Sequence, residues 1–248
     1  RLVPNPMECR STIGIYNEKK DDYTLYCSSQ GVHSLKRKLS NIFGKPEDKI
    51  NVITKDVGGG FGMKIFNYPE YILSLAASYI VRRPVKWVAS RSESFISDIH
   101  GRDHLSKATL GLNENYKFTG LYVETYANMG AYMSDFAVFI PTYAGTGMLT
   151  GCYDIEDAYA NVKGVYTNTG PTDAYRGAGR PEAAYLIERL VDKSAMELQI
   201  SPVKIREINL IDKSRMPYKT ALGHTYDSGD FKKNMNDAIA LADMKNFN

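Results

Sequence analysis

Residues 173–184 read DAYRGAGRPEAA and carry two glycines and two arginines in one short loop. Pro181-Glu182 then opens an apolar run with helical spacing, and proline favours the first position of a helix. Glycines before a helix start leave backbone N–H groups free, and the helix dipole adds partial positive charge there. Arg176 and Arg180 beside such a loop are typical of an anion clamp. The stretch predicts an anion site in front of a helix, with two solvated surface charges as the alternative.

A second glycine loop, GGGFG at residues 58–62, has the same setting. An expected strand runs into it, and Pro69-Glu70 opens another apolar helix soon afterwards. The loop matches neither the G-x-x-x-x-G-K-[ST] nor the G-x-G-x-x-G nucleotide motif. It favours binding of a phosphate or a metal-bound oxygen, because glycine lets the backbone come close to a ligand. A tight strand-to-helix turn and a generic phosphate-binding α/β protein are the alternatives.

Each half of the chain thus places strands, a glycine loop and a Pro-Glu helix in the same order. We predict an α+β fold of mixed sheets with packed helices, in two lobes of repeated layout, and internal duplication as its origin. The first lobe covers residues 1–100, and the second covers 101–248 with the AYRGAGR loop. Strands are expected at 21–31, 48–57, 84–90 and 157–170, with a hairpin at 104–132. Helices are expected at 32–44, 69–83, 181–198 and 201–211, followed by a polar, loop-rich tail from Asp212. The last of these helices is expected to be capped by Ser201, with Pro202 at its first position.

Two expectations concern which faces are buried. The helix at 69–83 is apolar nearly all round, which predicts that it is well buried. The helix at 181–198 is expected to bury Leu186, Leu190, Ala195 and Leu198.

Composition indicates an ordinary globular protein of 248 residues, with 43% hydrophobic and 24% charged residues. The net charge of +3 gives no sign of nucleic-acid binding, and no apolar run is long enough to span a membrane. Cys9, Cys27 and Cys152 lack metal-ligand spacing, so we expect buried free thiols in a cytoplasmic protein. His100 and His104 are expected in a loop or strand end. The missing initiator Met suggests a fragment or a processed chain.

The residues from PMECR (6–10) to IREINLI (205–211) resemble the molybdenum-cofactor subunit of the molybdenum hydroxylases. This family includes xanthine dehydrogenase, aldehyde oxidoreductases and aerobic carbon monoxide dehydrogenase. Gln30 in SSQG resembles the family glutamine that hydrogen-bonds an oxygen ligand of molybdenum. GGGFGMK resembles the loop whose Phe61-Gly62 backbone meets the metal's ligand sphere. AYRGAGRPEA is similar to the active-site loop, with Arg176 facing the substrate.

The resemblance implies oxidative hydroxylation of a small substrate, an aldehyde or a heteroaromatic, with water as the oxygen source. Arg176 and Gln30 are the implied catalytic residues, and no residue of the chain is expected to ligate a metal directly. A molybdenum–pterin dinucleotide, in its cytosine form, is the implied cofactor. The cofactor-binding residues implied are Gly59, Gly60, Phe61, Gly62, Gln30, Ala174, Tyr175, Arg176 and Gly177.

Two departures from the family pattern bear on the substrate. Carbon monoxide dehydrogenases have Cys-Ser-Phe after Ala-Tyr-Arg, whereas this loop reads Gly177-Ala178-Gly179, which puts a molybdenum–copper centre in doubt. The AYRGAGR form resembles homologues of the carbon monoxide dehydrogenase large chain. Xanthine dehydrogenases place a purine-orienting Glu where Ile65 stands and a stacking aromatic where Ala178 stands, so a purine substrate is not expected.

The resemblance also implies partners. These are a second molybdenum-cofactor domain or subunit, which carries the glutamate base, an iron–sulfur small subunit and a medium subunit with FAD. Because the second cofactor domain is not found in this sequence, we expect the isolated chain to be inactive and to bind little cofactor. A split or degenerate module of the same fold, with an assembly or anion-binding role, is the alternative; a Gly-x-Gly-Glu segment in the neighbouring sequence would favour the enzyme.

Overall fold

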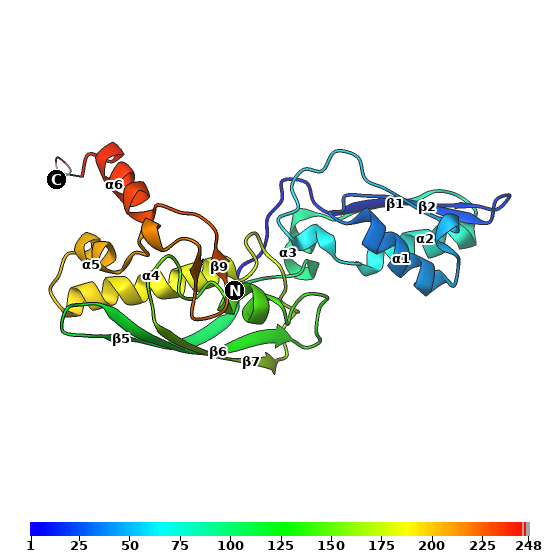
Figure 1. The fold of residues 1–248 in the computed structure, drawn as a ribbon. Coiled ribbons are helices and arrows are strands. Elements are labelled where there is room, and N and C mark those ends of the chain that lie inside the picture. Colours follow the sequence, from blue (N-terminus) through cyan, green and yellow to red (C-terminus); the bar gives the residue numbers. More distant parts are fainter. Residues whose placement is uncertain (245, 247–248) are drawn as a thin grey trace. The chain divides into compact units, whose positions relative to one another are not determined.

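The computed structural model describes residues 1–244 and 246, and it divides the chain into two compact units (Figure 1). Unit 1 comprises residues 1–103, 130–136 and 167–176. Unit 2 comprises residues 104–129, 137–166 and 177–248. Most of unit 1 is its first segment, and the two later segments return to it. The AYRGAGR loop is divided between the units after Arg176.

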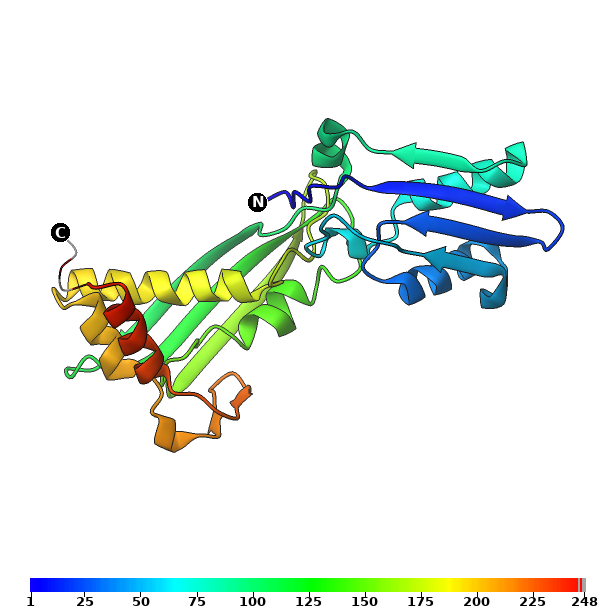
Figure 2. The same cartoon turned by 90° about the horizontal axis from the view of Figure 1, so that it is seen from above.

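A four-stranded mixed sheet forms one layer of unit 1 (Figure 2). Its strand order is β3-β2-β1-β4, with bounds β1 Ser11–Asn17, β2 Asp22–Cys27, β3 Ile50–Ile53 and β4 Val85–Val88. β1 is antiparallel to both neighbours, whereas β2 and β3 are parallel. The parallel pair needs a crossover, and helix α1 supplies it between them. Because they are parallel, β2 and β3 end on the same side of the sheet. SSQG follows β2 there, and the glycine loop follows β3.

Helices α1 (Val32–Phe43) and α2 (Pro69–Val81) lie along the sheet, and α3 (Arg91–Ser97) follows β4 (Figures 1 and 2). Short 3-10 turns lie at Glu47–Lys49 (η1) and Met63–Ile65 (η2). Leu25, Leu39, Ile50 and Leu75 form part of the shared core. The expectation that α2 is well buried is wrong, because one face is exposed: Ile80, for example, is 75% exposed. Its helical period places only some of its apolar residues toward the sheet.

Unit 2 is a three-stranded sheet, β5-β6-β7, with a long helix along one face (Figure 1). The bounds are β5 His104–Leu112, β6 Phe118–Gly130 and β7 Asp157–Tyr166, with helices α4 (Arg180–Glu197) and α5 (Pro202–Asn209). The expected hairpin is confirmed as antiparallel β5 and β6. Period-two alternation on β6 buries Leu121 and Val123 against Ile187 of α4.

The buried face of α4 includes Ala195, as expected, but differs from the expected one at the other three residues. Ala183, Ile187, Val191 and Ala195 are buried at four-residue spacing, while Leu186 and Leu190 are only partly buried. Leu198 is 42% exposed, because it follows the last turn of the helix, where the chain leaves the sheet. Ser201 caps α5 as expected, since its side chain accepts a hydrogen bond from the Val203 amide.

The tail from Asp212 contains more structure than expected. It forms η4 (Lys213–Arg215), the β8–β9 pair (Tyr218–Lys219 and Thr225–Tyr226) and helix α6 (Phe231–Leu241). The side chain of Asp230 caps α6 by accepting from the Lys233 amide, and Phe231 and Met235 pack on the unit 2 core. Helix α6 was not expected because only these two residues contact the core, so its sequence shows a weak helical period of apolar residues. A π-helical turn at Ile140–Ala144 (η3) completes the unit.

The α+β class of mixed sheets and packed helices is confirmed. A glycine loop precedes α2 in unit 1, and another precedes α4 in unit 2. However, the two sheets differ in strand number and order, which contradicts internal duplication. Within the described residues, no helix has the length and apolar character that crossing a membrane requires.

Candidate functional site

The glycine loop of unit 1 follows β3 and has an unusual backbone. Gly59, Phe61 and Gly62 have φ values of +93°, +54° and +95°. A Cβ on Gly60 would lie 2.5 Å from the side-chain oxygen of Gln30, and one on Gly62 would lie 2.6 Å from the carbonyl oxygen of Ala174. Side chains are therefore excluded at two positions where neighbouring segments approach the loop.

Gln30 lies between the end of β2 and the start of α1, and its amide is held by the loop. Its Oε1 accepts hydrogen bonds from the backbone N–H of Gly62 at 2.9 Å and of Lys64 at 3.2 Å. Its own backbone N–H donates to the Lys64 carbonyl at 3.0 Å. Because Oε1 has two donors, the amide orientation is fixed, and Nε2 is the group that points away from the loop.

The segment 173–176 contacts the same glycine loop, although it lies more than 100 residues further along the sequence. The Arg176 backbone N–H donates to the Phe61 carbonyl at 2.9 Å, and the Arg176 guanidinium carbon lies 5.8 Å from the centre of the Phe61 ring. Arg102 holds this segment by donating to the carbonyls of Tyr175 and Arg176, and it lies over the Tyr175 ring. Gln30, Phe61 and Arg176 are thus joined through one loop.

Asp173 anchors the start of this segment. Its Oδ1 accepts from the Ala174 amide at 2.6 Å and its Oδ2 from the Phe136 amide at 2.8 Å. The side chain is buried, and burial raises the pKa of its carboxyl despite these hydrogen bonds. The hydrogen bonds to Asp173 fix where the loop leaves the folded body of unit 1.

Three polar groups near the loop have no hydrogen-bond or ion-pair partner among residues 1–244 and 246. They are the Nε2 of Gln30, the backbone N–H of Phe61 and the guanidinium of Arg176. All three are donors, and both Gln30 and Arg176 are exposed. Unpaired donors on a glycine loop favour an anionic or oxygen-bearing ligand.

A buried ionic cluster lies beneath α2 and α3. The guanidinium of Arg10 is fully buried and donates to Asp98 at 2.5 Å and Glu70 at 2.7 Å. It lies 3.7 Å from the centre of the Tyr68 ring. Glu70 thus pairs with Arg10, and it also places a negative charge in the first turn of α2, where it complements the helix dipole. Burial raises the pKa of Asp98, and the nearby Arg10 charge only partly offsets that effect.

A molybdopterin cofactor-binding domain model matches residues 1–210 of the chain. The chain belongs to this family. It is 38% identical to the carbon monoxide dehydrogenase large chain of Hydrogenophaga pseudoflava, over 98% of this chain and 30% of that protein.

Solved structures agree with this assignment. Quinoline 2-oxidoreductase from Pseudomonas putida 86 matches with a TM-score of 0.94 and 27% identity, over 99% of this chain and 31% of that chain. Carbon monoxide dehydrogenase from Oligotropha carboxidovorans matches with a TM-score of 0.91 and 32% identity, over 97% and 30%. The resemblance to the molybdenum hydroxylases is confirmed. The chain spans less than a third of the length of these relatives.

The donor set fits a molybdopterin cofactor. Within the described residues, no group of three His, Cys, Asp or Glu side chains could hold a metal ion. The unpaired Nε2 of Gln30 and N–H of Phe61 are suited to hydrogen-bond oxygen atoms of such a group.

The predicted residues fall into two groups. Gln30, Gly59–Gly62 and Ala174–Arg176 all belong to unit 1 and are joined by the contacts above. Gly177 and Arg180 belong to unit 2, where Arg180 donates to the Ala178 carbonyl. The anion clamp of Arg176 with Arg180 stays a prediction.

Sequence reasoning missed three residues that organise the site: Glu8, Lys64 and Arg102. Lys64 Nζ lies 2.7 Å from Glu8 Oε2, and these residues are far apart in the sequence. Lys64 ends GGGFGMK and stands between the apolar residues Met63 and Ile65, so it could have been suspected of burial with a charged partner. No local pattern marks Glu8 or Arg102.

The cysteines are free, as predicted, but only Cys27 is buried. Burial raises the pKa of Cys27 to about 11 and that of Cys152 to about 11. Cys9 and Cys152 are partly exposed. His100 forms an isolated bridge and His104 begins β5, in agreement with the expected loop or strand end.

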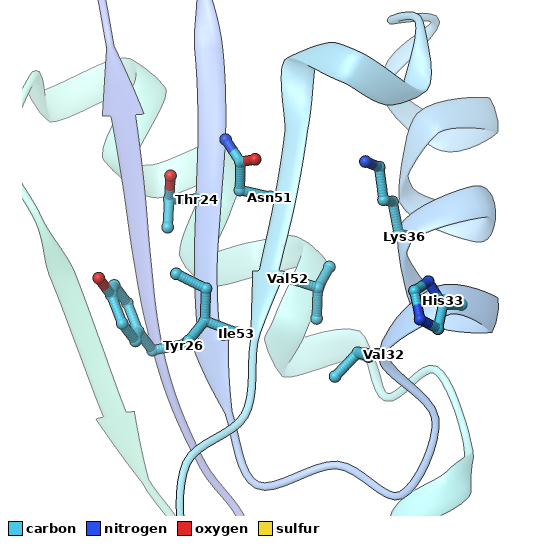
Figure 3. Close-up of a pocket in the computed structure, with 8 residues that line it drawn as sticks. All are labelled: Thr24, Tyr26, Val32, His33, Lys36, Asn51, Val52 and Ile53. Carbon is cyan, nitrogen blue, oxygen red and sulfur yellow. The ribbon is translucent and has the colours of Figure 1, made fainter.

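Two hollows in unit 1 lie apart from this loop. One, of about 890 Å³, is lined by residues such as Phe66, Asn67 and Tyr132. The other, of about 430 Å³, lies at the edge of the sheet, where His33 and Lys36 extend from α1 beside Val52 of β3 (Figure 3). Neither is lined by a predicted site residue.

Proposed function

We propose that this chain is part of the catalytic large subunit of a molybdenum hydroxylase. Its loops at Gln30, 59–62 and 174–177 hold a molybdenum–pterin dinucleotide, in the cytosine form. The observation that carries the proposal is the set of unpaired donors on Gln30, Phe61 and Arg176, joined through one glycine loop of a molybdopterin cofactor-binding domain.

When bound, the cofactor supplies oxidative hydroxylation of a carbon, with water as the oxygen source. The residues of this chain position the reacting groups and polarise them through hydrogen bonds and charge. Gln30 donates from Nε2 to an oxygen atom, with its amide already oriented by Gly62 and Lys64. The N–H of Phe61 adds a fixed dipole that needs no reorganisation. Arg176 stabilises negative charge that develops on a substrate oxygen.

The proposed substrate is a small aldehyde or heteroaromatic molecule. Quinoline 2-oxidoreductase and a nicotine 6-hydroxylase large subunit, both named for heteroaromatic substrates, are among the proteins it resembles. Carbon monoxide is a further substrate to test, because the chain is 38% identical to a carbon monoxide dehydrogenase large chain. The loop after Arg176 has no cysteine, so the proposal includes no copper ion.

The proposed partners are a second molybdenum-cofactor domain or subunit, an iron–sulfur subunit and an FAD subunit, which take the electrons. A relative is named as a subunit of a dehydrogenase complex, which supports assembly with partners. Because the second cofactor domain completes the cradle, the 248-residue chain alone should bind little molybdenum.

Metal and pterin analysis of the intact complex is the first test, followed by turnover with aldehydes, heteroaromatics and carbon monoxide. Arg176→Ala should lower kcat by about 100-fold if the guanidinium acts on developing charge. Arg37→Ala, which removes an exposed arginine of α1, is the matched control. A complex without molybdenum would reject the proposal and favour a non-catalytic module; an unchanged kcat in Arg176→Ala would remove the arginine from the mechanism.

A further inference from the structure

A single carboxylate closes the base of the glycine loop. Glu8 Oε2 accepts from the backbone N–H of Gly58 at 2.9 Å, where the loop begins, and from Lys64 Nζ at 2.7 Å, where it ends. The Glu8 backbone N–H also donates to the Gly58 carbonyl at 3.1 Å. Both ends of the loop are therefore tied to one residue of the N-terminal segment.

Lys64 connects this closure to Gln30. Its backbone N–H donates to Gln30 Oε1, and its carbonyl accepts from the Gln30 N–H. Its side chain is fully buried, whereas the Glu8 side chain is 34% exposed. A buried ammonium group requires a charged partner, so Lys64 is held where the Glu8 carboxylate lies. The peptide that orients the Gln30 amide is fixed by the same ion pair.

We propose that Glu8 is a positioning residue: its ion pair with Lys64 locks the loop 58–64 in the form that orients the Gln30 amide and presents the Phe61 N–H. The effect on turnover rests on the proposed function, but the lock itself does not. The variant Glu8→Gln keeps the shape of the side chain and removes its charge. Glu8→Asp keeps the charge but shortens the side chain, so that one carboxylate no longer spans both ends of the loop.

Hydrogen–deuterium exchange on the 248-residue chain tests the lock without any cofactor. In Glu8→Gln, the amides of Gly62 and Lys64 should exchange at least about tenfold faster, because they lose a fixed acceptor. Glu8→Asp should give a smaller increase at the same amides. Asp21→Asn, which removes the exposed ion pair with Lys45, is the control and should leave the loop unchanged.

The exchange pattern separates a lock from general support of the fold. Faster exchange confined to peptides covering 58–66 supports the proposal. Unchanged exchange there in both Glu8 variants overturns it. Equal acceleration in the core strand β2 and helix α2 also overturns it, since Glu8 would then stabilise the whole unit.

A double-mutant cycle in the molybdenum-loaded enzyme that contains this chain tests the consequence. Glu8→Gln should lower kcat by about 10- to 100-fold, with KM within about twofold. In a Gln30→Ala background the same substitution should have little further effect, because Glu8 acts through Gln30. If the losses in kcat of the two single variants add in the double variant, Glu8 does not act through Gln30. If Gln30→Ala alone leaves turnover unchanged, the role proposed for Gln30 has failed, and the exchange experiment alone decides the lock.

Discussion

The side-chain oxygen of Gln30 lies 2.9 Å from the backbone nitrogen of Gly62, so the glutamine amide is oriented before any ligand arrives. A second donor, the Lys64 amide, excludes the flipped orientation, in which Nε2 would face two N–H groups. The free Nε2 is therefore a donor of fixed direction. Donors fixed in advance stabilise charge without the cost of reorganisation, which is the property that the proposed role of Gln30 requires.

Substitution of Gln30 by Glu separates orientation from donation. A carboxylate at this position still accepts from Gly62 and Lys64, but it cannot donate. We expect Gln30→Glu to fold with a melting temperature close to wild type and to lose about 100-fold in kcat. Turnover and thermal melts of the loaded enzyme check this, with Gln30→Ala as the comparison that removes both functions. Near-normal kcat in Gln30→Glu would show that Nε2 donation is dispensable.

Gly62→Ala should distort the loop. The φ of +95° is strained for alanine, and its Cβ would lie 2.6 Å from the Ala174 carbonyl oxygen. We expect a loss of about 1–3 kcal/mol in the free energy of unfolding, measured by urea denaturation. Gly120→Ala is the control, because its Cβ would lie 3.7 Å from the Asp157 carbonyl oxygen, an ordinary contact. Equal stability of the two variants would contradict the steric argument.

Arg10→Met should be strongly destabilising. It leaves the carboxylates of Asp98 and Glu70 without their shared partner, and Asp98 is buried. We expect a loss of about 3–5 kcal/mol in the free energy of unfolding. Urea denaturation followed by circular dichroism measures it. Lys45→Met, which breaks an exposed pair with Asp21, should leave the midpoint nearly unchanged.

The buried carboxyl of Asp173 should make stability depend on pH in the acidic range. Its pKa is raised in the folded state by burial, so the folded protein binds the proton more tightly than the unfolded chain. The contribution of Asp173 is fully present below its unfolded pKa and is lost as pH rises through the higher folded pKa. Wild type should therefore lose stability relative to Asp173→Asn as the pH rises. Denaturation of both proteins between pH 3 and 7, about the range over which carboxyl groups titrate, measures this difference in unfolding free energy. A difference that does not vary with pH would contradict the raised pKa.

The element boundaries show what local pattern could predict. Alternation predicted β2, helical spacing predicted α1 and α4, and Pro with a preceding Ser predicted the start of α5. Strand β1 was missed because its segment follows a Pro-rich stretch, and α6 because only Phe231 and Met235 anchor it. The buried face of α4 was predicted correctly at Ala195 and one residue out of phase at Leu186 and Leu190, because each of these leucines stands next to another apolar residue.

The sequence by itself determined the site's local components: glycines that permit positive φ, a glutamine at a strand end, and an arginine beside a second loop. These follow from backbone sterics and from motifs, which act over a few residues. Only the tertiary structure decided the partners, Glu8 with Lys64, Arg102 with the Arg176 carbonyl, and Arg10 with Asp98. Each pairing joins segments distant in sequence. Folding buries the side chains of Arg10 and Lys64, and a buried charge is stable only where charged or polar groups of other segments pair with it.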